Sequence, residues 1–334
     1  MKPWLWLPPK LAHDLSPLGI DLFSLFYPER TPTWGSFSWN NIIFKNRLGL
    51  AGGVDKNADH LNAWMRLGCG FVEVGTVTPI AQKPNPGKIF DRSIADLALW
   101  NKMGFPSAGA ADVYYNLKNF KENCTLPLLI NIGKNRNTPN NQAHVDYVSQ
   151  VHHFHDLADA FVVNISSPNT TGLRDLAEPK ALELFLRPLA ESQVDQPMRK
   201  PILLKISPDL DADELKRVID TSLTFGIDGF VLTNTTSDRT TQKIFPPEGG
   251  VSGKPIEQQS KKALQVAIAH LGSEKSKKLV ISVGGVMTAA DVFERLRMGA
   301  DLVEVYTTLI FSGLHFFRKV AESANESNQE FNQF

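Results

Sequence analysis

The chain has 334 residues, of which 42% are hydrophobic and 21% are charged, so it can bury a substantial core and is not an intrinsically disordered protein. Lysine plus arginine and aspartate plus glutamate number 35 each, which excludes the global positive field of a nucleic-acid-binding protein. With only two cysteines, Cys69 and Cys124, a disulfide scaffold is excluded as well. No stretch reaches the roughly 18 uncharged apolar residues of a transmembrane helix.

The first predicted elements lie in residues 10–27, where apolar residues recur at helical spacing. Pro17 is expected to divide this segment into two short helices, and Trp4 and Trp6 precede it. Such a pair can lie on a membrane surface with its tryptophans at the level of the headgroups. It can also simply pack on the main domain, and composition alone favours packing because amphipathic helices usually cover cores.

Residues 36–45 follow and are typical of a β-hairpin with Asn40-Asn41 at its turn. Beyond residue 45, short apolar runs alternate with helical patterns, which favours a parallel (β/α)8 TIM barrel whose bottom the hairpin could close. A doubly wound open sheet is the alternative, but eight units over about 260 residues suit the barrel better. The eight runs are Leu48–Ala51, Phe71–Gly75, Leu126–Ile132, Ala160–Ile165, Pro201–Ile206, Gly229–Thr233, Leu279–Val283 and Leu302–Tyr306.

Polar residues and glycines gather at the carboxyl ends of these strands, where barrel enzymes place their active sites. A polar group inside a barrel strand needs a partner, and six strands with such groups imply a polar ligand across the mouth. Gly284-Gly285 and Tyr306-Thr307 follow strands seven and eight, where barrels commonly bind phosphate, and Gly249–Gly253 could extend that cradle.

Two kinds of side chain at these strand ends suggest what the ligand offers. Lys205 has no acidic partner nearby in the sequence, which predicts that it faces an anion or an electron-rich ligand atom. Asparagine side chains carry both donors and an acceptor, which suits a cyclic amide or a carboxylate. Each asparagine alone is typical of a loop or cap, but their shared location favours ligand binding. They are Asn101, Asn164, Asn169 and Asn234.

One ordered set of segments along the chain consists of Gly49–Asn57, Val74–Pro79, Asn101–Phe105, Ile130–Asn135, Asn164–Arg174, Thr233–Thr236 and Ser282–Val286. Taken together, these segments resemble those of the dihydroorotate dehydrogenases. This resemblance implies a barrel that holds flavin mononucleotide (FMN) at its mouth and divides the chain into a helical extension (residues 1–35), the barrel (36–325) and a polar tail (326–334).

The loop Ser166–Thr170 decides which class of that family the chain resembles. One class uses a cysteine base and the other a serine base, and neither cysteine of this chain falls in the loop. The resemblance therefore implies the serine class, which is membrane-associated and passes electrons to a quinone. It also reverses the interpretation of residues 1–35, which become a quinone-entry and membrane-docking element on the cytoplasmic side of the inner membrane. His13 matches a position that lines the quinone tunnel in relatives.

The resemblance also implies a role for each site residue. Ser167 would take the proton from C5 of dihydroorotate, Thr170 would relay it, and Phe105 would shield the site from water. The hydride would pass to the flavin, and orotate would leave. The substrate contacts would be Lys56, Asn101, Lys102, Met103, Gly104, Phe105, Asn164, Asn169, Asn234 and Thr235. The flavin contacts would be Ala51, Gly52, Gly53, Lys56, Thr76, Asn131, Asn164, Lys205, Thr233, Gly253, Gly285, Tyr306 and Thr307.

Two positions depart from the pattern of the relatives. Lys102 stands where they usually carry an arginine, and Asp91 stands where they carry another, with Arg92 one place later. Because that second arginine lies near the quinone tunnel in relatives, the alternatives are another FMN barrel oxidoreductase, a different electron acceptor such as fumarate or nicotinamide, or a flavin-binding scaffold without turnover. His152, His153 and His155 are interpreted as a helix face, and no metal is expected.

Overall fold

The computed structural model describes residues 2–121, 126–194, 198–240 and 243–326. Its centre is a closed barrel of eight parallel strands, and all eight predicted runs form it. In the order in which they neighbour one another, the strands are β10 (Gly229–Leu232), β12 (Leu279–Val283), β13 (Leu302–Val305), β3 (Leu48–Leu50), β4 (Val72–Val77), β7 (Leu128–Ile132), β8 (Ala160–Asn164) and β9 (Ile202–Ile206). The predicted barrel is therefore confirmed.

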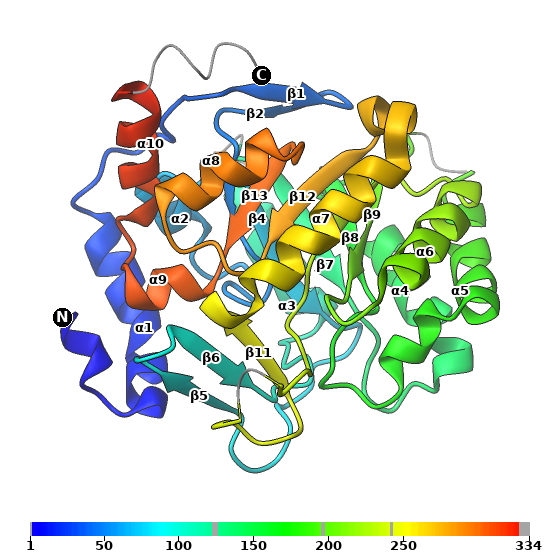
Figure 1. The fold of residues 1–334 in the computed structure, drawn as a ribbon, viewed down its shortest axis with the longest axis horizontal. Helices are drawn as coiled ribbons and strands as arrows, with labels where there is room; N and C mark the ends of the chain where they lie inside the picture. The colour runs from blue at the N-terminus through cyan, green and yellow to red at the C-terminus, as the bar shows by residue number, and fades with distance from the viewer. Residues whose placement is uncertain (1, 122–125, 195–197, 241–242, 327–334) are drawn as a thin grey trace.

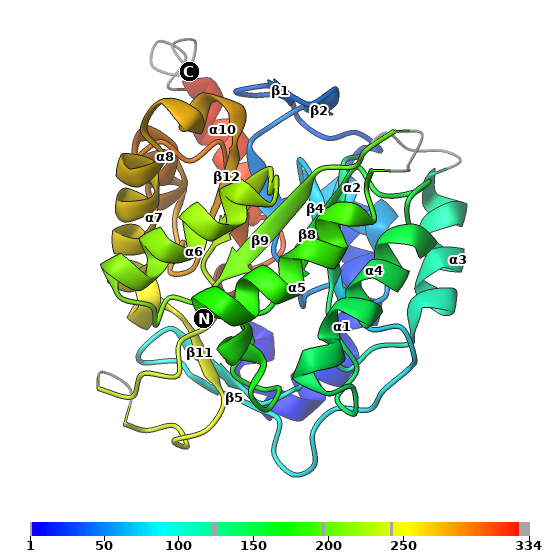
Figure 2. The same cartoon turned by 90° about the vertical axis from the view of Figure 1, so that its right-hand side faces the viewer.

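Helices cover the outside of the barrel (Figures 1 and 2). Each strand alternates, so that residues such as Leu204 and Ile206 pack outward against the helices while Leu203 packs inward. The covering helices are α2 (Leu61–Leu67), α3 (Ala110–Lys121), α4 (Ala143–His153), α5 (Pro179–Glu191), α6 (Ala212–Thr224), α7 (Glu257–Leu271), α8 (Ala289–Arg297) and α10 (Phe316–Glu326). The short helix α9 (Thr307–Phe311) directly follows β13.

The interior of the barrel has an apolar layer and, two residues further along the strands, a polar layer. Phe71, Leu129, Val162, Leu203, Val231 and Leu302 belong to the inner apolar cluster. The next inward positions on the same strands carry Glu73, Asn131, Asn164, Lys205, Thr233 and Glu304. The apolar layer stabilises the barrel, and the polar layer forms the floor of the mouth.

The predicted hairpin closes the opposite end of the barrel, as Figure 1 shows. Strands β1 (Phe37–Trp39) and β2 (Ile42–Phe44) are joined by Asn40 and Asn41, whose φ angles of 45° and 64° are those of a two-residue turn with a left-handed backbone. Phe44 is fully buried and meets Phe71 of the apolar layer edge to face, with ring centroids 5.6 Å apart. The hairpin was therefore predicted correctly.

The mouth of the barrel is covered by a second sheet and by the N-terminal segment (Figures 1 and 2). The sheet consists of β5 (Phe90–Ser93), β6 (Ala98–Asn101) and β11 (Gly250–Gly253), all antiparallel. The segment consists of a 3-10 turn, Pro3–Leu5, and helix α1, Pro9–Ser24, which contacts α2 and β5. No helix in the described parts of the chain is long and apolar enough to cross a bilayer.

The prediction of two short helices in the N-terminal segment is wrong, because α1 runs through Pro17 without a break. A proline lacks the N–H that would bond to the carbonyl four residues earlier, which here belongs to His13. The hydroxyl of Ser16 donates to that carbonyl at 2.7 Å and takes the place of the missing donor. The helix therefore keeps its direction past the proline.

Candidate active site

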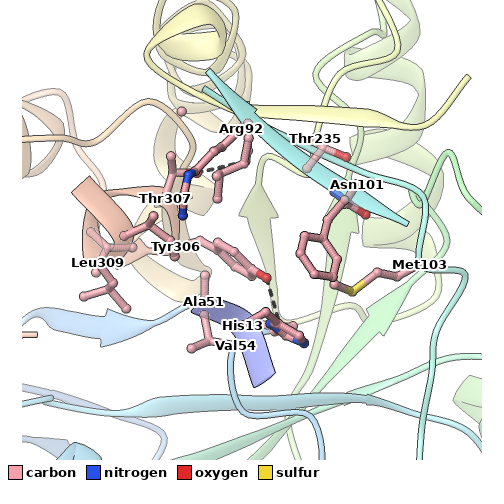
Figure 3. Close-up of a pocket in the computed structure, with 18 of the residues that line it drawn as sticks. His13, Ala51, Val54, Arg92, Asn101, Met103, Thr235, Tyr306, Thr307 and Leu309 are labelled. Atoms are coloured by element: carbon pink, nitrogen blue, oxygen red, sulfur yellow. Dashed lines mark hydrogen bonds between the residues drawn. The ribbon is translucent and has the colours of Figure 1, made fainter. Parts of the chain in front are cut away.

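One cavity of about 730 Å³ lies between the strand ends, the β5–β6–β11 sheet and α1. Figure 3 shows Tyr306, Asn101 and Met103 among the side chains that line it. The predicted site residues on its lining are His13, Ala51, Gly52, Gly53, Lys56, Thr76, Asn101, Met103, Gly104, Phe105, Asn164, Ser167, Asn169, Lys205, Thr233, Asn234, Thr235, Gly253, Gly285, Tyr306 and Thr307. Asn131, Lys102 and Thr170 are not on it.

The asparagines of the mouth form a network that links separate strand ends. Asn164 donates to the hydroxyl of Thr76 at 2.9 Å and accepts a hydrogen bond from Asn234 at 3.2 Å. Asn169 donates to the side-chain oxygen of Asn101 at 2.7 Å, which ties the loop after β8 to the end of β6. These side chains are therefore held in fixed orientations, as recognition of a polar ring requires.

Ser167 lies at the edge of this network with only 5% of its surface exposed. Its hydroxyl oxygen accepts a hydrogen bond from the backbone N–H of Asn169 at 3.2 Å. Its neighbour Ser166 instead accepts a hydrogen bond from Asn234 and does not line the cavity. The buried Thr170 follows in the same loop. Of these two neighbouring serines, only Ser167 faces the ligand space.

Arg174 holds this loop in place, a role that was not predicted from the sequence. Its guanidinium donates to the carbonyls of Ser166 at 2.9 Å and Thr235 at 3.0 Å and pairs with Asp209 at 2.7 Å. Burial alone would raise the pKa of Asp209, but hydrogen bonds from Ser237 and Thr236 and the charge of Arg174 outweigh it and lower the pKa. Asp209 therefore stays ionised and keeps Arg174 in position.

Lys205 has a partner that its sequence neighbourhood does not reveal. Its ammonium lies 2.6 Å from Glu73 Oε1 across the interior of the barrel, and Asn131 donates to the same oxygen. The expectation of a lysine facing only a ligand is therefore corrected, because its ammonium also pairs with the Glu73 carboxylate. Asn131 supports this pair from below the cavity.

Lys56 projects into the cavity from the loop after β3, which Asp55 anchors. The Asp55 carboxylate accepts hydrogen bonds from the backbone N–H groups of Asp59 and His60 and from the indole of Trp64. Burial lowers the pKa of Lys56, and the charge of Asp55 only partly offsets this effect. An anionic ligand would supply the counter-charge that the Lys56 ammonium needs.

Two glycines on the lining pack so closely against neighbouring parts of the chain that no side chain would fit there. A Cβ on Gly253, whose φ is 95°, would lie 2.2 Å from the carbonyl oxygen of Leu97. A Cβ on Gly285 would lie 2.3 Å from Cα of Glu257. Neither glycine places a side chain between its backbone and the cavity, so a ligand can approach the backbone closely on this side of the mouth.

The segment 101–105 divides its residues between the cavity and the surface. Phe105, which is 8% exposed, adopts a φ of 55° that turns its ring inward against Gly133. Lys102 points away and pairs with Glu248 at 3.2 Å. Lys102 thus lies outside the ligand space, whereas Asn101, Met103 and Phe105 line it.

The other end of the cavity is formed by α1 and β5. His13 packs its ring against Phe90, with centroids 4.9 Å apart, and burial lowers the pKa of His13. Arg92 donates to the backbone carbonyls of Leu5, at 2.9 Å, and Leu7, and so fastens the N-terminal segment to the sheet. Asp91 instead pairs with Lys88 at 2.5 Å. Arg92, one place after the substituted Asp91, is therefore the residue that holds the apolar end together.

The histidines singled out in the sequence lie away from this cavity, in and just after α4. His153 contacts the ring of Tyr114 at 5.1 Å, and Nε2 of His155 lies 2.7 Å from the carbonyl oxygen of Met198. Within the described residues, the acidic group compact enough for a metal is Glu257, Asp291 and Glu294. Lys261 already pairs with Glu257 at 2.8 Å and Glu294 at 2.7 Å.

Comparison with known proteins gives a consistent result. Residues 37–327 match the family model described as dihydroorotate dehydrogenase. A dihydroorotate dehydrogenase (quinone) of Marinobacter nauticus is 36% identical over 95% of this chain and 95% of its own length. One from Thermus thermophilus is 41% identical over 84% of this chain and 79% of its own length. The crystal structure of the Eimeria tenella enzyme in complex with ferulenol superposes with a TM-score of 0.86 at 31% identity, covering 97% of this chain and 93% of that one.

Proposed function

The chain belongs to the dihydroorotate dehydrogenase family, and from this premise we propose that it oxidises dihydroorotate to orotate with a quinone as electron acceptor, in the synthesis of pyrimidine nucleotides. One observation carries the proposal: a single cavity joins the polar mouth around Ser167 to the apolar space beneath α1. A redox enzyme with a polar substrate and a lipophilic acceptor needs two such ends around one cofactor.

FMN is the cofactor that we propose for the centre of the cavity. Two buried acceptors on its lining, Asn169 Oδ1 and Thr233 Oγ1, lack hydrogen-bond partners among the described residues, which fits a polar ligand. Gly253 and Gly285 line the cavity without side chains, so a phosphate group could approach their backbone. Lys205 would lie beside the ring atoms that gain negative charge. When bound, FMN accepts a hydride at its N5 atom.

The substrate would lie against the asparagine network. Asn101, Asn164, Asn169 and Asn234 offer amide donors and acceptors to its ring and carboxylate, and Lys56 offers a positive charge. Ser167 would take the proton from C5, and because a serine hydroxyl is a poor base it must pass that proton on, with Thr170 as the proposed relay. Phe105 would keep bulk water from the reacting atoms.

The quinone would enter beneath α1, beside His13 and the guanidinium of Arg92. The outer face of α1 and the two residues that follow it support a membrane approach, because large apolar side chains stay exposed there: Leu11 at 45%, Leu18 at 71%, Leu22 at 60%, Leu25 at 65% and Phe26 at 80%. A soluble surface rarely leaves such a stripe uncovered. We therefore propose peripheral attachment to the cytoplasmic side of the inner membrane through residues 1–35.

The two half-reactions test the proposal separately. Dihydroorotate added without oxygen to the purified yellow protein should bleach the flavin absorbance, and a lipophilic quinone should restore it. Fumarate and a nicotinamide nucleotide, offered in place of the quinone, distinguish the alternative acceptors. A purified protein that binds no flavin would overturn the assignment, and bleaching that only fumarate or nicotinamide reverses would overturn the quinone half.

A further inference from the structure

Three charged side chains meet in the polar layer of the barrel, directly below the cavity. Glu73, Lys205 and Glu304 come from β4, β9 and β13 and point inward at alternate positions of their strands. Glu73 and Glu304 are 0% exposed, and Lys205 is 5% exposed. Lys205 and Glu304 are on the lining of the cavity. We call these three side chains the floor group.

The hydrogen bonds of the floor group are unequally distributed. Glu73 Oε1 receives the ammonium of Lys205 at 2.6 Å and the amide of Asn131. Glu73 Oε2 and both carboxyl oxygens of Glu304 have no partner within the described ranges. An ionised carboxylate with two unpaired oxygens in a buried site is strongly unfavourable, whereas a protonated one can donate to a neighbouring acceptor.

The balance of charges in the floor group also favours a protonated Glu304. Two carboxylates and one ammonium leave one negative charge buried, and like charges at close range do not both ionise. The pKa of Glu304 is raised well above its ordinary value by burial first and by the charge of Glu73 second, against the opposing charge of Lys205. The adjacent strand residues Gly49 and Val283 are not titratable.

Cys69 also lies close enough to Glu304 for the two groups to affect each other's titration, and its thiol is neutral. Cys69, in the turn before β4, is fully buried, and burial strongly raises the pKa of its thiol. It therefore adds no charge to the floor of the cavity. Among the described residues, Lys205 is the cation whose charge lowers the pKa of Glu304, and its ammonium already forms an ion pair with Glu73.

We propose that Glu304 is a neutral carboxylic acid at neutral pH, that it shares its proton with Oε2 of Glu73, and that the floor group thereby has no net charge beneath the cofactor. Gly52 makes this arrangement possible, because a Cβ at that position would lie 2.0 Å from Glu73 Oε1. Glu304 acts as a positioning residue, since it keeps Glu73 engaged with Lys205 and leaves the remaining hydrogens of the Lys205 ammonium free to face the cavity.

The shared proton has a consequence for the flavin, which rests on the proposed function. Reduction places negative charge near Lys205, so an ionised Glu304 would oppose reduction and a neutral one does not. Conversely, reduction of the flavin raises the pKa of Glu304, because the coupling between two sites is reciprocal. The midpoint potential should therefore fall more steeply with pH once the pH rises past the pKa of Glu304.

Infrared spectroscopy tests the protonation directly on the protein as purified. The spectrum of the wild type minus that of Glu304→Gln should contain the carbonyl stretch of a protonated carboxylic acid, and this band should shift in D2O. The matched control is Glu183→Gln, whose carboxylate is exposed on α5 and pairs with Arg187, and its difference spectrum should contain carboxylate bands only. Carboxylate bands for Glu304 as well would overturn the proposal.

The midpoint potential of the bound flavin tests the consequence. Glutamine imitates a protonated glutamate, so at pH 7 the wild type and Glu304→Gln should agree to within less than a tenfold change in the oxidised-to-reduced equilibrium, which is about 30 mV for two electrons. The extra fall at high pH should vanish in the variant. A higher potential for Glu304→Gln at pH 7 would mean an ionised Glu304. A protein without flavin would instead contradict the proposed function and leave the infrared result standing.

Discussion

The two ends of the cavity are built in different ways. At the barrel mouth, side chains from separate strands hold one another by short hydrogen bonds, such as Asn169 to Asn101 at 2.7 Å. The N-terminal segment is fixed at a few points, among them the indole of Trp4 on the carbonyl of Ile310 at 2.7 Å and His60 on Asp21 at 2.9 Å. Polar groups that must be oriented precisely thus lie at the strand ends, whereas the end that needs only apolar contacts is formed by a single helix.

The largest effect is expected at the mouth, from Ser167→Ala. The variant should keep its flavin but reduce it with dihydroorotate about 10²–10⁴-fold more slowly, because a positioned base contributes about that factor. Stopped-flow bleaching without oxygen measures the rate. The control is Cys69→Ala, which removes a buried thiol of raised pKa and should leave the rate unchanged. Near-normal bleaching in Ser167→Ala would show that Ser167 is not the base.

A second test concerns the outer face of α1. Leu18 and Leu22 are exposed and do not line the cavity, so Leu18→Glu with Leu22→Glu should leave flavin reduction intact. Binding to anionic lipid vesicles should weaken by about 10–100-fold, because each leucine, about half buried at the membrane surface, contributes roughly 0.7–1.5 kcal/mol. Flotation with vesicles measures the change, and turnover with a membrane-bound quinone should fall with it.

The matched control for that test places the same charges elsewhere. Val145 on α4 is 56% exposed and Leu184 on α5 is 62% exposed. Val145→Glu with Leu184→Glu adds two carboxylates to the barrel surface, far from α1 in the chain. Vesicle binding should stay at the wild-type level in this variant. An equal loss of vesicle binding in both double variants would indicate a general effect of added charge. It would contradict the proposal that α1 is the membrane-binding surface.

A smaller effect is expected from pH at the polar end. Burial lowers the pKa of Lys56, so the ammonium loses its proton below the ordinary lysine value of about 10.4. As pH rises through that lowered pKa, the charge that attracts the substrate carboxylate disappears, and KM for dihydroorotate should rise by up to about tenfold per pH unit. Steady-state kinetics across pH 6–10 show the rise. Lys56→Arg stays charged and should remove it, and a flat wild-type profile would contradict the role.

The sequence could predict what depends on neighbours along the chain. The eight strands follow from short apolar runs at regular spacing, and the β1–β2 turn follows from Asn40-Asn41, which tolerate a left-handed backbone. Asn164, Asn169 and Asn234 were found because strand ends share one rim in a parallel barrel, whereas Ser167 was found from the resemblance of its loop to a family motif. These features need no knowledge of which distant residues meet.

The features that were missed depend on distant contacts. Glu73 is 132 residues from Lys205, and only closure of the barrel brings the two together. Arg174 holds the Ser167 loop through Asp209 and Thr235, which belong to other strands' loops. Lys102 looked like a substrate contact because of its motif, but its partner Glu248 lies far along the chain. Side-chain direction at such positions is decided by tertiary packing.

The smallest effect is expected from Pro17→Ala, which asks how firmly the N-terminal helix is held. Alanine restores the backbone donor to the His13 carbonyl, now served by Ser16, and an interior proline costs a helix up to about 3 kcal/mol. Amide hydrogen exchange in α1 should therefore slow, while both half-reactions change less than about twofold. Pro188→Ala in α5 is the control, since it should slow exchange in that helix only. Faster exchange in α1 after Pro17→Ala would mean that Pro17 stabilises the geometry in which α1 packs over the mouth. The N-terminal segment would then be packed as specifically as the barrel, which would contradict the contrast between the two regions.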